Sequence, residues 1–394
     1  MKSSLTLLLF FLSLTTLLSQ EKKFEVSVHG YLGLNVTHDS YNSSSSRYGH
    51  VYRYPVPNAD GVPNRQRLDI SAAHSRLSFQ VKGPELSGYN TSAYIEADFL
   101  GSTTDAMLRL RHAYMTFDGA KFSLLAGQTW HPVILSESMP SAILNNNAGA
   151  PIHSLNRNPQ IRFTWKTGDK LQLIASVVDQ HISRSSGFAD GTEQSGIPEI
   201  DLQAKFSSGK WWATIVAGSK QLAIPTAIAP TKNPVNITHF HYSASMRYRA
   251  GNFTAKAGAL YGDNLTEHTK PGSIGKTNNN KYIPLRSLST WIDLNSLHKK
   301  TEIGVLAGYF SNMGAPEKID EVVSSISRDA SIKDIYVVSP RVKYFIIPQI
   351  FVGVEYMMTL AGWGEAGEFN NYGIPQNVSD VTNHRVLFSM RYSF

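Results

Sequence analysis

The sequence predicts an all-β protein, a transmembrane antiparallel up-and-down β-barrel with sixteen strands. Three observations predict it. Apolar and polar residues alternate in segments along the whole chain. The connections between these segments are alternately short and long. No stretch after residue 20 has the roughly 20 consecutive apolar residues of a membrane-spanning helix, whereas a barrel strand needs only every second residue to face lipid.

Composition agrees with this fold class. Aromatic residues make up 11% of the 394 residues, with 18 Tyr and 18 Phe, as aromatic girdles at two membrane interfaces require. The chain has no cysteine, which excludes a disulfide-stapled domain and a thiolate metal site.

The first residues have the pattern of a secretory signal peptide. Lys2 supplies a positive charge, residues 5–18 are mostly apolar, and Ser19-Gln20 is a suitable cleavage point. We therefore expect residues 1–19 to be a signal peptide and 20–394 to form the barrel. Loss of Lys2 lowers the net charge from +7 to +6. Export makes nucleic acid an improbable partner for these charges, so we expect them to face water, partly in a barrel lumen.

Sixteen segments have the alternation of strands, and the first shows it best. Val26, Val28, Leu32 and Leu34 share one face of it. In order, the expected strands are 24–37, 68–83, 89–100, 107–118, 121–130, 160–166, 170–179, 199–207, 210–221, 237–249, 252–262, 285–294, 300–310, 334–345, 349–361 and 383–394.

The connections between these segments differ in length according to parity. Those after even-numbered strands are tight, at 84–88, 119–120, 167–169, 208–209, 250–251, near Asn295 and at 346–348. Those after odd-numbered strands are mostly long, at 38–67, 131–159, 180–198, 222–236, 263–284, 311–333 and 362–382, with 101–106 the one short exception. This is typical of bacterial barrels, which have short periplasmic turns and long external loops. Within 311–333, we expect one amphipathic helix at 316–330.

The last strand carries a further signal. Val386, Phe388, Met390 and Tyr392 alternate with polar or charged residues up to the final Phe394. An alternating C-terminal strand that ends in Phe resembles the signal read by the outer-membrane assembly machinery. We therefore expect that machinery to be a partner, with bilayer lipid and lipopolysaccharide around the folded barrel.

The parity of the strands also assigns the charged residues. A Lys or Arg that faces lipid at the bilayer midplane costs about 2–4 kcal/mol, so we expect the charged side chains to point inward. The candidate pore-lining residues are Arg76, Lys82, Glu96, Asp98, Arg109, Arg111, Arg162, Arg247, Arg341 and Arg385. Because basic residues dominate, the predicted pore favours small anionic solutes. The alternative for one part of it is a structural ladder in which Glu96 and Asp98 pair with Arg109 and Arg111.

The third external connection, 131–159, contains apolar, proline and asparagine-rich portions. The third external loop of general porins folds inward and narrows the pore. We expect 131–159 to be such a constriction loop, and an ordinary surface loop is the alternative.

Five runs stand out between residues 75 and 162: SRLSFQVKGP at 75–84, AYIEADF at 93–99, LRLRHAY at 108–114, AGQTW at 126–130 and NPQIR at 158–162. Together they resemble DcaP-like porins, channels for dicarboxylates and related anions. The resemblance implies a homotrimer of sixteen-stranded barrels with Arg76, Arg109, Arg111 and Arg162 lining the pore or its constriction. Some members carry an N-terminal coiled coil, which is missing here between the predicted cleavage point and the first strand, so barrel walls and loops would hold a trimer together.

Two other functions remain open on the sequence. One is a surface adhesin or structural barrel whose long loops bind a partner. The other is a phospholipase-like barrel enzyme, which needs a Ser/His pair on the lipid face near the outer rim. We expect no enzyme activity and no cofactor. His239 and His241 share one strand face, but two ligands without nearby carboxylates are a weak metal site, so we expect no metal.

Overall fold

The computed structural model describes residues 24–59, 61–102, 106–141, 150–180, 183–188, 190–229 and 235–394. The expected signal peptide lies outside these residues, as does the portion 142–149 of the expected constriction loop 131–159. Over the described part of the chain, no helix is long and apolar enough to cross a membrane.

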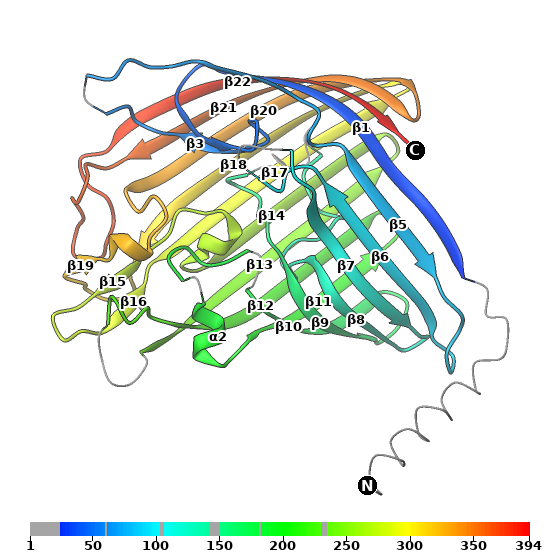
Figure 1. The fold of residues 1–394 in the computed structure, drawn as a ribbon, viewed down its shortest axis with the longest axis horizontal. Coiled ribbons are helices and arrows are strands. Elements are labelled where there is room, and N and C mark those ends of the chain that lie inside the picture. The colour runs from blue at the N-terminus through cyan, green and yellow to red at the C-terminus, as the bar shows by residue number, and fades with distance from the viewer. Residues whose placement is uncertain are drawn as a thin grey trace, which may run out of the picture.

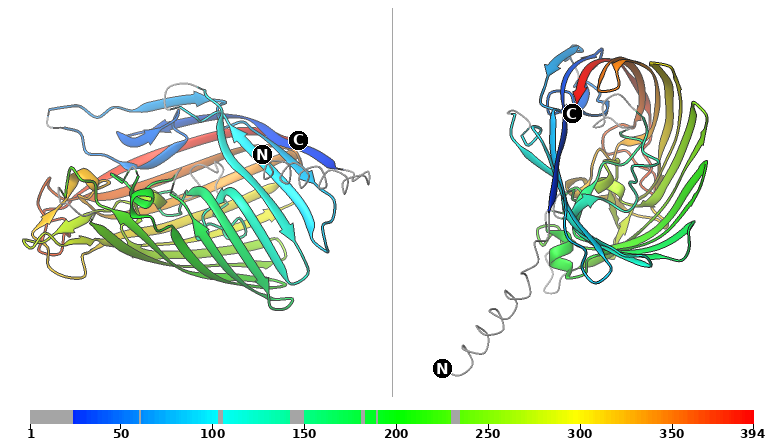
Figure 2. Two further views of the ribbon diagram at one scale, coloured as in Figure 1. Left: turned by 60° about the horizontal axis from the view of Figure 1, so that its bottom comes forward. Right: turned by 90° about the vertical axis from the view of Figure 1, so that its right-hand side faces the viewer.

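The main sheet is antiparallel and curves round until its first strand meets its last (Figures 1 and 2). Seventeen strands take part, but β4 and β5 are two segments of one strand that both pair with β1, which leaves sixteen strand positions. The strands of this sheet are β1 (Glu25–Asp39), β4 (Arg67–Ser71), β5 (Arg76–Lys82), β6 (Asn90–Asp98), β7 (Arg109–Asp118), β8 (Phe122–Trp130), β9 (Arg157–Lys166), β10 (Leu171–Val178), β11 (Glu199–Ser208), β12 (Trp211–Ala223), β13 (Asn236–Ala250), β14 (Phe253–Asp263), β17 (Arg286–His298), β18 (Thr301–Gly314), β20 (Ile332–Ile347), β21 (Ile350–Trp363) and β22 (Ser379–Ser393). All sixteen expected strands are confirmed.

Closure depends on the two ends of the chain. β1 pairs with β22 from Tyr31 opposite Ser393 to Asp39 opposite Arg385. Beyond that ladder, Gly30 and Phe394 exchange two backbone hydrogen bonds, with N···O distances of 2.9 and 3.0 Å. These pairings satisfy backbone groups that would otherwise form a free sheet edge in lipid.

The expected alternation of side chains is also present. In β22, Val386 and Met390 are 44% and 47% exposed, whereas Arg385 and Ser389, each one position earlier, are buried. A strand places successive side chains on opposite faces, so the exposed apolar set covers the outside of the barrel and the polar set faces the lumen.

Connection lengths separate by end of the barrel, as expected. Short turns such as 119–121 and 167–170 lie at the end that holds the start of β1 and the end of β22, and the long loops lie at the other. One expected boundary is wrong, because β17 continues to His298 and the turn lies at Lys299-Lys300 rather than near Asn295.

The expected helix at 316–330 is also wrong. The segment contains only the two-residue strand β19 (Glu321–Val322) and the 3-10 turn η3 (Ser324–Ile326). β19 pairs with β15 (Ile274–Lys276) of a neighbouring loop, and Val323 and Ile326 are buried in a cluster of loop side chains. The apolar spacing therefore reflects packing between loops, not the face of a helix.

We predict that Ile161→Arg lowers the free energy of unfolding by about 2–4 kcal/mol. Ile161 is 57% exposed on the outer face of β9, where lipid cannot solvate a guanidinium. The control is Thr164→Arg on the same strand. Because Thr164 lines a cavity of about 620 Å³ inside the barrel, its substitution should change the value by no more than about 0.5 kcal/mol. Urea titration in lipid vesicles measures both, and equal losses would contradict the assignment of faces.

Candidate functional site

The inner wall of β5, β6 and β7 carries a cluster of arginines and carboxylates. Asp98 accepts hydrogen bonds from Arg109 at 2.6 and 2.9 Å and from Arg111 at 3.1 Å. Glu96 accepts one from Arg111 at 2.6 Å and lies 3.4 Å from the guanidinium of Arg76. The pairing alternative for these residues is therefore the arrangement present, with three arginines around two carboxylates.

A β-bulge shapes this cluster. The register of β6 and β7 shifts between Glu96 and Ala97, so that Arg111 and His112 are both buried although they are adjacent in sequence. A bulge turns an extra side chain toward one face. Strict period-2 alternation would place His112 on the face opposite Arg111. It cannot predict that both are buried, because the shift depends on how two strands pair.

Aromatic rings stabilise some of the positively charged arginines. The Arg157 and Arg111 guanidinium carbons lie 4.6 and 5.8 Å from the centre of the Trp130 ring. The Arg76 guanidinium lies 5.2 Å from the ring of Tyr31. A guanidinium over an aromatic face is stabilised without a carboxylate, which allows basic residues to outnumber acidic ones here.

Three other candidate residues are tied to carboxylates. Arg341 lies 2.7 Å from Asp293, and Arg385 lies 3.5 Å from Asp39. Lys82 lies 3.2 Å from Glu25, but both side chains are more than half exposed at the turn end of the barrel. The first two pairs are buried in the wall, and Lys82 belongs to the rim.

Several inward basic side chains form no ion pair with a carboxylate of the described residues. They are Arg157, Arg162, Arg247 and Lys256. Arg162 donates instead to the Trp130 carbonyl at 3.0 Å and to Gln160 at 2.6 Å. Arg162 also lines the cavity of about 620 Å³, together with Lys82, Lys205 and Asp118. These four basic side chains add positive charge to the lumen that no described carboxylate balances at ion-pair distance.

The described part of loop 131–159 lies inside the barrel against its inner wall. Glu137 lies 3.0 Å from Lys205 of β11, and Ser138 is hydrogen-bonded to Ser245 of β13 at 2.9 Å. The Lys256 ammonium donates to the Met139 carbonyl at 2.7 Å. Burial alone would raise the pKa of the Glu137 carboxyl, but the charge of Lys205 and its hydrogen bonds outweigh burial and lower it.

Apolar side chains hold the same loop in place. Val133 and Ile134 are buried with Val216 of β12 and Leu260 of β14. Farther along, Ile152 is buried with Trp291 and residues of β18 and β20. The loop thus contacts the wall from β11 to β20. The sequence suggested that this loop folds into the pore, but it could not show which strands the loop contacts.

With this geometry in view, solved structures of similar fold are informative. The outer membrane channel DcaP of Acinetobacter baumannii has a TM-score of 0.71 and 18% identity, over 94% of this chain and 97% of that one. This chain has the fold of outer-membrane porins. An anion-selective porin from Comamonas acidovorans gives 0.60 and 10%, over 94% and 100%. OmpT, an outer membrane protein of Vibrio cholerae, gives 0.56 and 11%, over 95% and 99%. No protein-family model and no curated sequence matches the chain.

We predict that Arg111→Met lowers the free energy of unfolding by about 3–5 kcal/mol, because Glu96 and Asp98 lose a buried partner. The control is Lys82→Met, which breaks an exposed pair and should cost less than about 1 kcal/mol. Urea titration in vesicles measures both. A small loss for Arg111→Met would mean that water already screens this cluster.

We predict that the double variant Ser138→Cys/Ser245→Cys forms a disulfide on mild oxidation. The two hydroxyl oxygens lie 2.9 Å apart, and the chain has no other cysteine to compete. Gel mobility with and without reductant reports the bond. Pairing Ser138→Cys with Ser92→Cys of β6 provides a control that should not cross-link, and reversed results would place the loop elsewhere.

Proposed function

We propose that this protein is a bacterial outer-membrane porin, a passive diffusion channel for small hydrophilic solutes with a preference for anions such as dicarboxylates. We infer no catalytic activity. The observation that carries the proposal is a closed barrel in which the inward positions of the strands hold more Lys and Arg than Asp and Glu. Several of these basic side chains have no carboxylate partner among the described residues.

The electrostatic argument follows from the geometry of the lumen. Low-dielectric walls focus the field of inward charges and raise the local concentration of counter-ions. Arg162, Arg247 and Lys256 contribute charge that no described carboxylate neutralises at short range. A solute with two carboxylates can contact two such groups at once, which supports dicarboxylates as substrates.

The position of loop 131–159 supports a role for it in narrowing the pore. Its described residues fill space beside β11 to β14 that a solute would otherwise cross, and they do so through polar as well as apolar contacts. Narrowing the lumen on one side moves solutes toward the opposite wall, where Arg76, Arg109 and Arg111 lie.

We also infer export to the outer membrane through cleavage of residues 1–19, and assembly into a homotrimer. A trimer form of OmpT from Vibrio cholerae is among the similar structures, with a TM-score of 0.52. The outer faces of the strands are apolar, so lipid, lipopolysaccharide or a second barrel can cover them. The strand that ends in Phe394 supports recognition by the assembly machinery.

We predict that the double variant Arg162→Gln/Arg247→Gln has a lower anion-over-cation permeability ratio than the wild type. Both charges face the lumen, and their removal weakens the field along the pore. Reversal potentials in planar bilayers under a salt gradient measure the ratio. Lys210→Gln removes a charge from an exposed turn between β11 and β12 and should leave the potential unchanged. A wild-type barrel that is closed or prefers cations would overturn the proposed function.

A further inference from the structure

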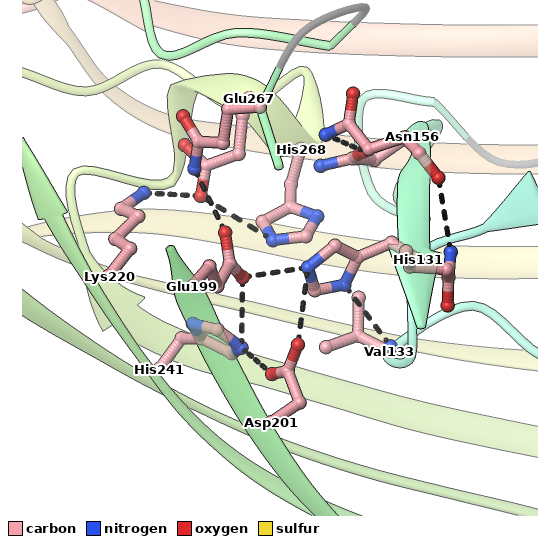
Figure 3. Close-up of polar contacts among 12 residues, drawn as sticks. His131, Val133, Asn156, Glu199, Asp201, Lys220, His241, Glu267 and His268 are labelled. Atoms are coloured by element: carbon pink, nitrogen blue, oxygen red, sulfur yellow. Dashed lines mark hydrogen bonds and ion pairs between the residues drawn. The ribbon is translucent and has the colours of Figure 1, made fainter. Parts of the chain in front are cut away.

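We propose that His131, Glu199, Asp201 and His241 form a binding site for a divalent transition-metal ion, with Zn²⁺ as the ion that fits best. One atom from each residue can act as a ligand, and these four atoms lie within 4.8 Å of one another (Figure 3). Two imidazoles with two carboxylates are a ligand set of transition metals, whereas Ca²⁺ and Mg²⁺ favour oxygen alone. The site goes beyond the proposed transport function and does not depend on it.

The barrel brings these residues together from three places. His131 follows β8 directly, Glu199 and Asp201 point inward from β11, and His241 points inward from β13. Because β12 separates β11 from β13, Asp201 and His241 can meet only across it. In the sheet register, Gly218 of β12 lies between them.

Gly218 makes that meeting possible. A Cβ atom at this position would overlap the carboxylate of Asp201 and the imidazole of His241. Because Gly218 has no side chain, Asp201 and His241 can approach each other over its backbone. A glycine inside a strand often marks a close approach of this kind.

The distances are close to those of a tetrahedral site. Glu199 Oε1 lies 2.7 Å from His131 Nε2 and 3.8 Å from His241 Nε2. Asp201 lies 2.7 Å from His241 Nε2 and 3.6 Å from His131 Nε2. Bonds to Zn²⁺ of about 2.0–2.2 Å separate tetrahedral ligands by about 3.3–3.6 Å. The widest separation among the four atoms is within 4.8 Å, so the most distant pair would have to close by about 1.2 Å to surround one ion.

Charge and burial also favour a cation. All four side chains are at most 1% exposed, so two carboxylates lie away from bulk water. Lys220, a basic side chain close enough to act on the cluster, forms an ion pair with Glu267 instead. A divalent ion would balance the two carboxylates while both imidazoles stay neutral.

Around the four residues lie a hydrogen-bond donor that orients Glu199 and several polar atoms without a hydrogen bond to a described residue. Gln180 Nε2 donates to Glu199 Oε2 at 3.0 Å, which leaves Oε1 directed at the site; hydrogen bonds of this kind orient carboxylates that bind metals. Asp201 Oδ2 and both ring nitrogens of the buried His268 have no hydrogen-bond partner in the described part of the chain. The His268 ring centre lies 4.8 Å from that of His131.

Binding has two identifiable costs. An ion would take the place of the Nε2 protons and so break the 2.7 Å hydrogen bonds that His131 donates to Glu199 and His241 donates to Asp201. The second cost concerns the other ring nitrogen of His131. The Val133 N–H donates to His131 Nδ1 at 3.3 Å, so Nε2 carries the ring proton in this arrangement. Coordination through Nε2 moves that proton to Nδ1 and releases the hydrogen bond. At 3.3 Å this bond is longer than the usual 2.7–3.2 Å and is correspondingly weak.

One premise behind the expectation of no metal is wrong. His241 does have carboxylates beside it, from a strand about 40 positions earlier in the sequence. His239 is not part of the site, although it shares the same inner face of β13. His239 therefore provides a matched control, two residues away on the same strand.

The test uses the mature full chain without an affinity tag, folded in detergent and stripped with a chelator. After incubation with Zn²⁺ and gel filtration, elemental analysis should find one ion per wild-type chain. His241→Gln and Asp201→Asn should lose at least nine-tenths of that zinc, and His239→Gln should retain it. A zinc-free wild type overturns the proposal, as does equal retention by all variants, since the four residues then form only a hydrogen-bonded network.

A second measurement does not depend on folding of the variants. Co²⁺ bound by the wild-type barrel should show the intense visible absorption of a tetrahedral site, and Zn²⁺ should abolish it. A weak octahedral spectrum would overturn the proposal. Anion selectivity measured in bilayers is a separate readout, so failure of the metal site and failure of the proposed porin function can be distinguished.

Discussion

The rest of the structure depends on one constraint, that every backbone N–H and C=O in the bilayer needs a hydrogen-bond partner within the protein. A sheet meets it only by closing on itself. Here closure is the pairing of β1 with β22, continued by Gly30 and Phe394. An even number of strands, and the position of both chain ends at the same end of the barrel, follow from that closed antiparallel ladder.

Closure also determines where charge can go. An outer wall in lipid excludes charged side chains, so the lumen receives them, and the barrel then has to stabilise many cations in a narrow space. It uses three means: carboxylates at Glu96 and Asp98, the rings of Trp130 and Tyr31, and loop carbonyls that accept from Lys256. Aromatic rings and carbonyl oxygens stabilise a cation without cancelling its charge, whereas a carboxylate cancels it. Because only some of the cations are paired with carboxylates, the lumen keeps the positive charge that supports the proposed anion preference.

Loop 131–159 connects the pore with the buried histidine and carboxylate cluster. Its first residue, His131, contacts Glu199 of β11, and the next turn packs on β12 and β14. The proposed constriction and the proposed metal site therefore share one attachment point. An ion held there would join the start of the loop to two strands of the wall, in addition to the hydrogen bond between Ser138 and Ser245.

The sequence by itself determined the sixteen strands, their faces, the sorting of loop lengths and the inward direction of the charges. These follow from local alternation, because a strand exposes successive side chains to opposite environments. Only the tertiary structure decided which side chains contact one another. The bulge that buries Arg111 beside His112, the loop packing that replaces the expected helix at 316–330, and the approach of Asp201 to His241 across Gly218 depend on register between strands. Register relates residues far apart in the chain, and the alternation within one strand does not encode it.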